Sequence, residues 1–163
     1  MLLAGSLGLW PAPAPAASQV YFDGALAALV EQVEAATASI DVAIFDFTSA
    51  ELATALVRAR DRGVAIRIVA DARQARGRRS AIPLLRSAGI DVRIARGRGV
   101  MHQKFAIFDG RLLVTGSYNW TDAAERRNSE NALFLDEPAL VARYGEWFER
   151  QFAGAATVTP ATR

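Results

Sequence analysis

The chain has 163 residues, of which 52% are hydrophobic and 22% charged, a balance typical of one globular domain with a single core. It contains no cysteine and one histidine, which excludes disulfides, a thiol nucleophile and cysteine-ligated metal sites and argues against any zinc centre. The net charge is only +2, so overall charge does not identify a partner.

Residues 1–18 form a leader that differs in composition from the rest of the chain. An apolar stretch of about ten residues is followed by Pro/Ala repeats that end in A-P-A-A-S. This pattern suits a secretory signal peptide, although no basic residue precedes Arg58. We therefore expect a periplasmic or secreted protein with an atypical or N-truncated signal, or a cytoplasmic one if the leader is only a linker. The leader is too short to span a membrane, so we expect no stable membrane insertion.

The first half of the chain alternates between strand and helix patterns. Residues 19–22 predict a short strand, and residues 25–36 place leucine and valine at the spacing of an amphipathic helix. Residues 39–47 alternate apolar and polar positions and are rich in β-branched and aromatic side chains, which predicts a strand. A serine cap and a closing glycine indicate a helix over residues 49–62.

Basic loops interrupt the alternation in the middle of the chain. Residues 64–70 form an apolar run typical of a buried parallel strand. We expect a loop over residues 73–79, a helix over 80–88 and a short strand over 90–94. Residues 96–99, R-G-R-G, form a second basic loop.

A hairpin and a long helix make up the last part of the chain. We expect a strand over residues 100–108, a tight turn at 109–110 and the returning strand of a hairpin over 111–115. A helical turn over residues 121–127 and a further strand over 130–135 follow. Residues 138–152 predict a helix with an apolar stripe.

Alternating strands and helices followed by a hairpin indicate an α/β fold. We expect a mixed β-sheet covered by helices on both faces, which is a three-layer α/β/α sandwich. Residues 19–153 would form a single domain, and residues 154–163 a frayed tail.

The most informative local feature is a pair of residue types that the chain uses once each. His102 is the only histidine and Lys104 the only lysine, because the other eighteen basic residues are arginine. Arginine keeps its charge and is bulkier than the point-like ammonium of lysine, whereas imidazole titrates near neutral pH. The sequence therefore places a compact cation beside a group that can gain or lose a proton.

On the predicted strand, His102 and Lys104 share one face and lie about 7 Å apart. The turn after this strand fixes the register of the hairpin, which brings Ser117 and Asn119 of G-S-Y-N to the same end. Ammonium, hydroxyl and amide groups can all donate hydrogen bonds to one phosphate, and none of them needs a metal. We therefore expect these four residues to form a phosphate site.

His102 is the reactive member of this set. A neutral imidazole can attack phosphorus, and a protonated imidazole can donate to a leaving oxygen. Two-step cleavage of a phosphodiester needs both roles, so one histidine per chain predicts a homodimer with the active site at its two-fold interface. Glu130 is the best candidate for a carboxylate that orients the imidazole. Asp109 closes the hairpin and is expected to hold the turn or neighbouring backbone.

The middle of the chain is strongly basic. Between Arg58 and Arg98 there are twelve arginines and three aspartates. Such a segment suits a polyanion, either nucleic acid or a phospholipid head-group surface. We expect helix-face arginines to be solvated and loop arginines to bind substrate. The loop set is Arg73, Arg76, Arg78, Arg79, Arg96 and Arg98, and the helix set is Arg58, Arg60, Arg62 and Arg86.

The string H-Q-K-F-A-I-F-D followed by G-S-Y-N resembles the HKD motif of the phospholipase D superfamily. Within that superfamily the chain looks like the small single-motif bacterial endonucleases, over residues 19–152. The resemblance implies a phospholipase D-like fold, a homodimer, a phosphohistidine intermediate and no metal or other cofactor. It also implies one set of catalytic residues, namely His102, Lys104, Asp109, Ser117, Asn119 and Glu130.

The substrate is a choice between three hypotheses, because the superfamily cleaves DNA, RNA and phospholipids with the same core. The loop arginines favour a non-specific endonuclease, since they can follow a backbone without reading bases. The first alternative is a phospholipase D acting on cardiolipin or phosphatidylcholine, with an apolar surface drawn from Phe45, Phe47, Tyr118 and Trp120. The second alternative is a non-enzymatic nucleic-acid-binding protein that uses only the arginines.

Overall fold

The computed structural model describes residues 18–97 and 99–157. The first seventeen residues of the leader expected over residues 1–18, Arg98 and the last six residues lie outside the described residues. The strands are β1 (Gln19–Phe22), β2 (Ser39–Ile44), β3 (Ala65–Ala70), β4 (Asp91–Ile94), β5 (Lys104–Phe108), β6 (Leu112–Gly116), β7 (Asn131–Leu135) and β8 (Ala156–Thr157). The helices are α1 (Leu26–Ala35), α2 (Ala50–Asp61), η1 (Gln74–Arg76, a 3-10 helix), α3 (Ile82–Ser87), α4 (Asp122–Arg126) and α5 (Pro138–Gly154).

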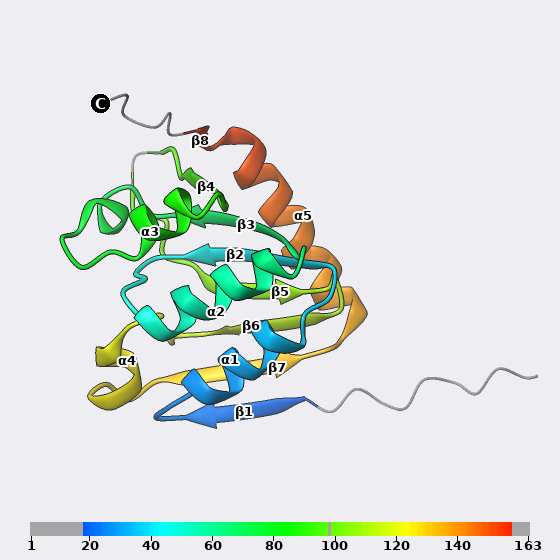
Figure 1. Ribbon diagram of the computed structural model, residues 1–163. Helices are drawn as coiled ribbons and strands as arrows, with labels where there is room; N and C mark the ends of the chain where they lie inside the picture. The colour runs from blue at the N-terminus through cyan, green and yellow to red at the C-terminus, as the bar shows by residue number, and fades with distance from the viewer. Residues whose placement is uncertain (1–17, 98, 158–163) are drawn as a thin grey trace, which may run out of the picture.

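The strands form one eight-stranded sheet in the order β1-β7-β6-β5-β2-β3-β4-β8 (Figure 1). β2, β3 and β4 run parallel to one another, as expected for strands joined through helices. The other neighbouring pairs are antiparallel. This mixed sheet confirms the α/β fold that the alternation of elements predicts.

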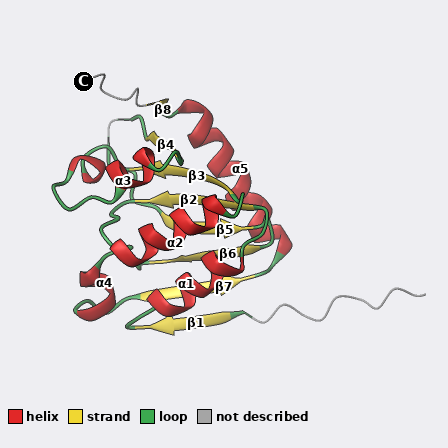
Figure 2. Ribbon diagram, in the orientation of Figure 1, coloured by secondary structure: helices red, strands yellow, loops and turns green. Residues whose placement is uncertain are grey.

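Helices lie on both faces of the sheet, which gives the three expected layers (Figure 2). The larger core lies between the sheet and α1, α2 and α3, where Leu29, Leu56 and Leu85 are at most 1% exposed. On the opposite face, α5 packs its apolar stripe against β3, β5 and β6. Phe148 of α5 and Phe105 of β5 are buried at that contact.

The face that carries α5, called the α5 face below, is covered unevenly. Tyr21 of β1 packs on the opposite face against Phe134, with ring centroids 5.0 Å apart. Because side chains alternate along a strand, Val20 and Phe22 point to the α5 face. They are 50% and 69% exposed. The β1 end of the α5 face is therefore an apolar surface that none of the described helices covers.

Two strands are shorter than expected. β2 ends at Ile44, because beyond it the N–H of Asp46 donates to Asn119 Oδ1 at 3.3 Å and leaves the ladder. β5 begins at Lys104, so His102 lies just before the strand and not within it. The two side chains still meet on one side of the backbone, as the strand pattern predicts.

The regions expected to be irregular contain additional structure. The loop over residues 73–79 includes the short helix η1. The tail expected to fray from residue 154 instead continues as β8, in which Thr157 and Ala156 pair with Arg93 and Ile94 of β4. The expectation of a frayed tail is therefore wrong for these residues, because the free edge of β4 offers them a partner.

Candidate active site

The functional side chains gather at one edge of the sheet. Lys104 at the start of β5 pairs with Ile44 at the end of β2. Gly116 at the end of β6 pairs with Ala132 near the start of β7. The segments just outside these pairs therefore meet at the same edge. They are residues 102–103, 117–119 and 128–130.

His102 and Lys104 are in direct contact. Lys104 Nζ lies 3.1 Å from His102 Nδ1 and 3.1 Å from Nε2, and it donates to the His102 carbonyl oxygen at 2.9 Å. The Phe45 ring borders both groups, with its centroid 4.5 Å from that of the imidazole and 5.1 Å from Lys104 Nζ. The contact with a ring nitrogen is a hydrogen bond only while that nitrogen carries no proton, and an unprotonated nitrogen is also the one that can attack phosphorus.

The environment of Lys104 prepares it for an anion. Burial lowers the pKa of Lys104, and the negative charge of Glu130 opposes this shift only in part. A partly dehydrated ammonium attracts an approaching anion more strongly than a fully hydrated one does. Lys104 is therefore suited to bind a phosphoryl oxygen next to the imidazole.

Ser117 and Glu130 form one hydrogen-bonded unit between β6 and β7. Ser117 Oγ donates to Glu130 Oε2 and accepts from the N–H of Asn131 at 3.1 Å. Asn128 Nδ2 donates to Glu130 Oε1 at 2.8 Å. In this structure Glu130 therefore holds Ser117, and the contact with His102 expected for it is absent among the described residues of one chain.

Asn119 and Ser117 are held in place by the residue between them. Asn119 Oδ1 accepts from the N–H of Asp46, which leaves the amide nitrogen as the group that can donate to a ligand. Tyr118 is 4% exposed and donates to Glu125 Oε2 at 2.6 Å. Burial and the neighbouring Glu125 carboxylate raise the pKa of Tyr118, so the phenol stays protonated and keeps this bond. Tyr118 therefore anchors the loop that carries both polar residues.

The acyl-binding surface expected for a phospholipase is not formed by the aromatic residues suggested for it. Phe47, Tyr118 and Trp120 are 2%, 4% and 3% exposed. Phe47 packs edge-on against Trp120, with ring centroids 5.0 Å apart. These three residues belong to the core, and of the four candidates only Phe45 reaches the surface in part.

Asp109 lies at the far end of β5 from Lys104, about 16 Å along the strand by the usual rise per residue. Its carboxylate accepts from the backbone N–H groups of Thr37, Ala38 and Ser39 at 2.8–3.2 Å. This placement agrees with the expectation that the side chain holds the turn and neighbouring backbone. We therefore expect Asp109 to act in folding, and its inclusion among the catalytic residues stays untested.

The arginines divide between helix faces and loops. On the helices, Arg58 and Arg62 form ion pairs with Glu34, and Arg60 pairs with Asp61. The loop arginines are exposed and form no ion pair within the described residues. These are Arg73, Arg76, Arg78, Arg79 and Arg96, whereas Arg98 lies outside the described residues. Their loops follow β3 and β4, at the sheet edge where His102 lies.

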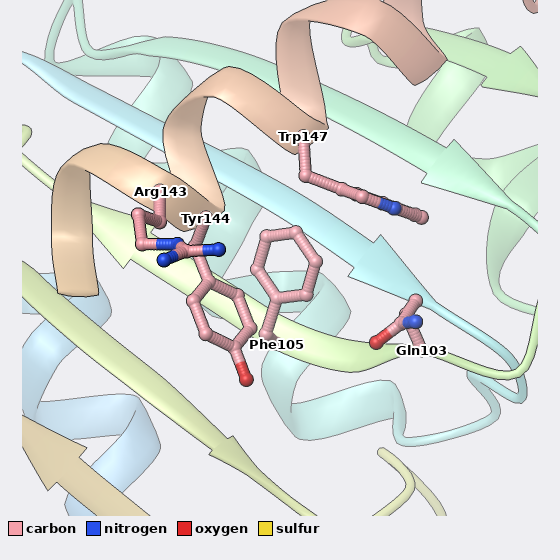
Figure 3. Close-up of a pocket in the computed structure, with 5 residues that line it drawn as sticks. All are labelled: Gln103, Phe105, Arg143, Tyr144 and Trp147. Atoms are coloured by element: carbon pink, nitrogen blue, oxygen red, sulfur yellow. The ribbon is translucent and has the colours of Figure 1, made fainter.

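Two adjoining cavities open beside the site. The first has a volume of about 220 Å³, and its lining includes Asp71, Arg96, His102, Gln103 and Trp147. The second has a volume of about 240 Å³ and lies on the α5 face, lined by Gln103, Phe105, Arg143, Tyr144 and Trp147. Figure 3 shows Tyr144 and Trp147 reaching from α5 toward Phe105 on β5. The shared residues Gln103 and Trp147 connect the catalytic edge with the α5 face.

Two residues at the site were not predicted for it. Phe45 borders His102 and Lys104, although its sequence context suggested only an apolar surface. Asp71 lines the cavity beside His102 but was counted only as one of three aspartates in a basic segment. The available signal was its position directly after a buried parallel strand, where functional side chains of α/β sheets gather.

The arrangement can bind a phosphate group and attack its phosphorus. Lys104 and the amide of Asn119 can each donate to phosphoryl oxygens, and the His102 imidazole is an available nucleophile. Among residues 18–97 and 99–157, no group of three or more His, Cys, Asp or Glu side chains could hold a metal ion. Within the same residues, no helix is long and apolar enough to cross a membrane.

Comparison with known proteins places this fold and site in one family. A family model described as "Cardiolipin synthase, PLD-like domain" matches residues 29–152. The chain is 43% identical over 128 residues to the mitochondrial cardiolipin hydrolase of Homo sapiens, which covers 78% of this chain and 51% of that protein. It is 35% identical over 124 residues to a phospholipase D of Rickettsia prowazekii (strain Madrid E), covering 76% of this chain and 60% of that protein. Nuc from Salmonella typhimurium, a phospholipase D family member of solved structure, has a TM-score of 0.82 at 30% identity and covers 88% of this chain and 98% of that chain.

The chain therefore belongs to the PLD-like domain family of the phospholipase D superfamily. This confirms the resemblance carried by the HKD motif, and the match to Nuc supports the likeness to small bacterial members. The chain spans about half the length of the human relative, so the activity of that whole protein does not transfer to it directly.

Proposed function

We propose that this protein is a metal-independent phosphodiesterase that acts on nucleic acid, most simply as a non-specific endonuclease. The observation that carries the proposal is the contact between His102 and Lys104 beside a cluster of exposed loop arginines. The unprotonated imidazole nitrogen attacks phosphorus, so that an N–P bond forms while the bond to the leaving oxygen breaks. A second imidazolium gives that oxygen a proton, and it later takes a proton from the water that hydrolyses the phosphohistidine.

The second imidazole is supplied by a second copy of the chain, because each chain has only His102. The two-fold axis must then pass close to the cavity that His102 lines. The catalytic edge offers apolar surface for such a contact, since Phe22 is 69% exposed and pairs with Asn131, which directly follows Glu130 at that edge. We propose a homodimer that joins across this edge, which buries Phe22 and brings the two imidazoles together.

The arginine loops support nucleic acid as the substrate. The five described loop arginines are exposed at the catalytic edge and form no ion pair among the described residues, and only the charge of Arg73 acts on a nearby carboxylate, that of Asp71. An extended phosphate backbone can satisfy several of them at once, and such contacts do not depend on base sequence.

A phospholipase is the second candidate, because the relative with 43% identity is named a mitochondrial cardiolipin hydrolase. Cardiolipin or phosphatidylcholine would also present phosphodiesters to His102, and the same arginines could meet a head-group surface. Val100, which is 48% exposed and lines the cavity beside His102, is an apolar residue that could touch a lipid. The third candidate, a nucleic-acid binder without catalysis, gives no reason for the His102–Lys104 contact.

The leader bears on where the protein works. Its apolar stretch and small-residue end support export to the periplasm or beyond, and a cytoplasmic location follows if it is only a linker.

The test is degradation of plasmid and single-stranded DNA in excess EDTA by wild type and by His102→Ala. We expect wild type to cleave both, and His102→Ala to be slower by at least about 1000-fold, as for loss of a nucleophile. Cardiolipin and phosphatidylcholine vesicles are assayed in parallel for release of phosphatidyl products. Cleavage of vesicles but not DNA would establish the phospholipase, and DNA binding without any cleavage would establish the binder. Equal rates for wild type and His102→Ala would refute the phosphohistidine route.

A further inference from the structure

Asp71 connects the arginine loop with the segment that carries His102. It directly follows β3 and is only 2% exposed. Its Oδ1 accepts from the backbone N–H groups of Arg73 at 2.9 Å and Gln74 at 3.1 Å. Its Oδ2 accepts from the backbone N–H of Met101 at 3.0 Å. One buried carboxylate therefore holds the start of the arginine loop with one oxygen and the residue before His102 with the other.

The backbone N–H groups keep this carboxylate charged despite its burial. Burial raises the pKa of Asp71, but the backbone hydrogen bonds from Gln74, Met101 and Arg73, together with the positive charge of Arg73, outweigh it and hold that pKa below its ordinary value. A buried carboxylate is costly to leave with an unsatisfied oxygen, so both segments are held to it strongly.

The contact with Met101 matters because His102 lies before the first ladder pair of β5. On one side of His102, the carbonyl of Gln103 accepts from the N–H of Phe45 at 2.8 Å. On the other side, the bond from Met101 to Asp71 holds the backbone. The imidazole is therefore carried by a short segment fixed at two points, and Asp71 supplies one of them.

We propose that Asp71 is a positioning residue that sets the location of His102 relative to the arginine loop. A phosphate held by the loop arginines would then lie within reach of the imidazole. Asp71, Arg96 and His102 line the same cavity, which agrees with this assignment. The inference rests on the proposed function for the phosphodiester substrate, whereas the link between the two segments can be measured without any substrate.

The test uses Asp71→Asn, which keeps the side-chain shape but replaces one accepting oxygen with an NH₂ group that cannot accept a hydrogen bond. Asp41→Asn is the matched control. Asp41 lies in β2, and its carboxylate accepts from the Arg67 guanidinium at 2.7 and 2.8 Å, with no contact to the cavity beside His102. Both variants remove one charge and at least one strong hydrogen bond, at a position in β2 for Asp41 and directly after the adjacent β3 for Asp71.

The first readout is the NMR signal of the imidazole C–H groups, which needs no assignment because the chain has one histidine. We expect Asp71→Asn to shift this signal and to weaken its response to inorganic phosphate at least about fivefold, while Asp41→Asn leaves both as in wild type. The second readout is turnover, where Asp71→Asn should lower kcat at least about tenfold through misplacement of the nucleophile. An unchanged imidazole signal and phosphate response, with only a lower melting temperature, would overturn the proposal.

Hydrogen exchange in the wild-type protein tests the link if Asp71→Asn does not fold. The amides of Arg73, Gln74 and Met101 should exchange at least about 100-fold more slowly than exposed amides of the same loops. Fast exchange at Met101 would overturn the proposal without any variant. If wild type cleaves no nucleic acid but the imidazole responds to Asp71→Asn as expected, the endonuclease proposal fails and the positioning role stands.

Discussion

Asp109→Asn tests whether the aspartate of the HKD motif acts in chemistry or in folding. The carboxylate contacts residues 37–39 at the far end of β5, so we expect the substitution to lower stability and not catalysis. Asp109 has a backbone φ of 51°, in the left-handed region that asparagine tolerates well. The substitution therefore changes the hydrogen bonds and the charge without adding backbone strain.

The size of the effect follows from the contacts. Oδ1 accepts from the backbone N–H groups of Ala38 at 2.8 Å, Ser39 at 3.0 Å and Thr37 at 3.2 Å, and Oδ2 accepts from the Thr37 N–H at 3.1 Å and from Thr37 Oγ1 at 3.2 Å. An asparagine oxygen in the place of Oδ1 keeps the three Oδ1 bonds without their charge assistance, and the substitution loses both bonds from Thr37 to Oδ2. Each charge-assisted hydrogen bond contributes about 1 kcal/mol more to stability than a neutral one. Because Asp109 is partly exposed, we expect the total loss of stability to be about 1–2 kcal/mol. For a chain of this size, the melting temperature should fall by about 2–8 °C.

The pH dependence gives a second signature. Burial raises the pKa of Asp109, but the N–H groups of Ser39, Ala38 and Thr37 outweigh it and hold the pKa below its usual value. A depressed pKa in the folded state contributes stability above the unfolded-state pKa of about 4, and this contribution is lost as the pH falls through the folded-state value. The stability difference between wild type and Asp109→Asn should therefore be full at pH 7 and should shrink below about pH 4.

Thermal unfolding at pH 7 and at pH 3, with kcat measured well below the melting temperature, checks both parts. Asp109→Ala serves as the comparison. Alanine is less favourable than asparagine in the left-handed region of backbone conformation, so the Asp109→Ala variant should be less stable than Asp109→Asn. We expect kcat of Asp109→Asn to stay within about threefold of wild type, because the carboxylate lies far from Lys104. A wild-type melting temperature combined with a 100-fold lower kcat would show that Asp109 takes part in catalysis.

Three further predictions concern the cation, the substrate surface and the dimer. Lys104→Arg should lower initial rates at least about 100-fold although the charge is retained. The planar guanidinium cannot replace a compact ammonium that lies 3.1 Å from both imidazole nitrogens. A rate near that of wild type would contradict this. Arg76→Ala should reduce the slope of log affinity for DNA against log salt by about 1, whereas Arg58→Ala, which removes a partner of Glu34, should leave the slope unchanged. Phe22→Asp should be monomeric in sedimentation and should abolish turnover. The control Leu84→Asp, at a similarly exposed leucine of α3, should remain dimeric. A dimeric Phe22→Asp would place the interface elsewhere.

The parts of the fold that could be predicted from the sequence are those specified by local pattern. Ser49 was expected to cap a helix, and its side chain accepts from the N–H of Leu52 at 3.3 Å. An apolar stripe was expected on the helix over residues 138–152, and in the structure it packs on the sheet, where Phe148 is fully buried. In contrast, β8 has only two residues, and its pairing depends on the free edge of β4, which no local pattern describes.

The same distinction applies to the site. His102 and Lys104 could be identified because each residue type occurs once and their spacing puts both on one side of the backbone. Glu130 was predicted at the edge of the sheet where it lies, but its side chain bonds Ser117 instead of the expected His102. The strand pattern predicts which segments lie close together, and it does not predict which hydrogen bond a side chain makes. Asp71 is thirty residues from Met101. Its position directly after a buried parallel strand indicates the edge of the sheet where it lies, but no local pattern gives its hydrogen bond to Met101.

The substrate is harder to predict from the sequence than the reaction, because different surfaces of the protein determine the two. Lys104 and Asn119 can contact only phosphoryl oxygens, which nucleic acids and phospholipids share. Whatever flanks the phosphorus must be recognised outside that set, and we expect the loop arginines to do so. The arginines lie on two separate loops, after β3 and after β4, and have no ion-pair partner among the described residues. A single head group cannot neutralise charges spread in this way, whereas a continuous phosphate backbone or a whole membrane surface can. The decisive property is therefore the extent of the polyanion, and the salt dependence of binding to DNA compared with anionic vesicles measures it directly.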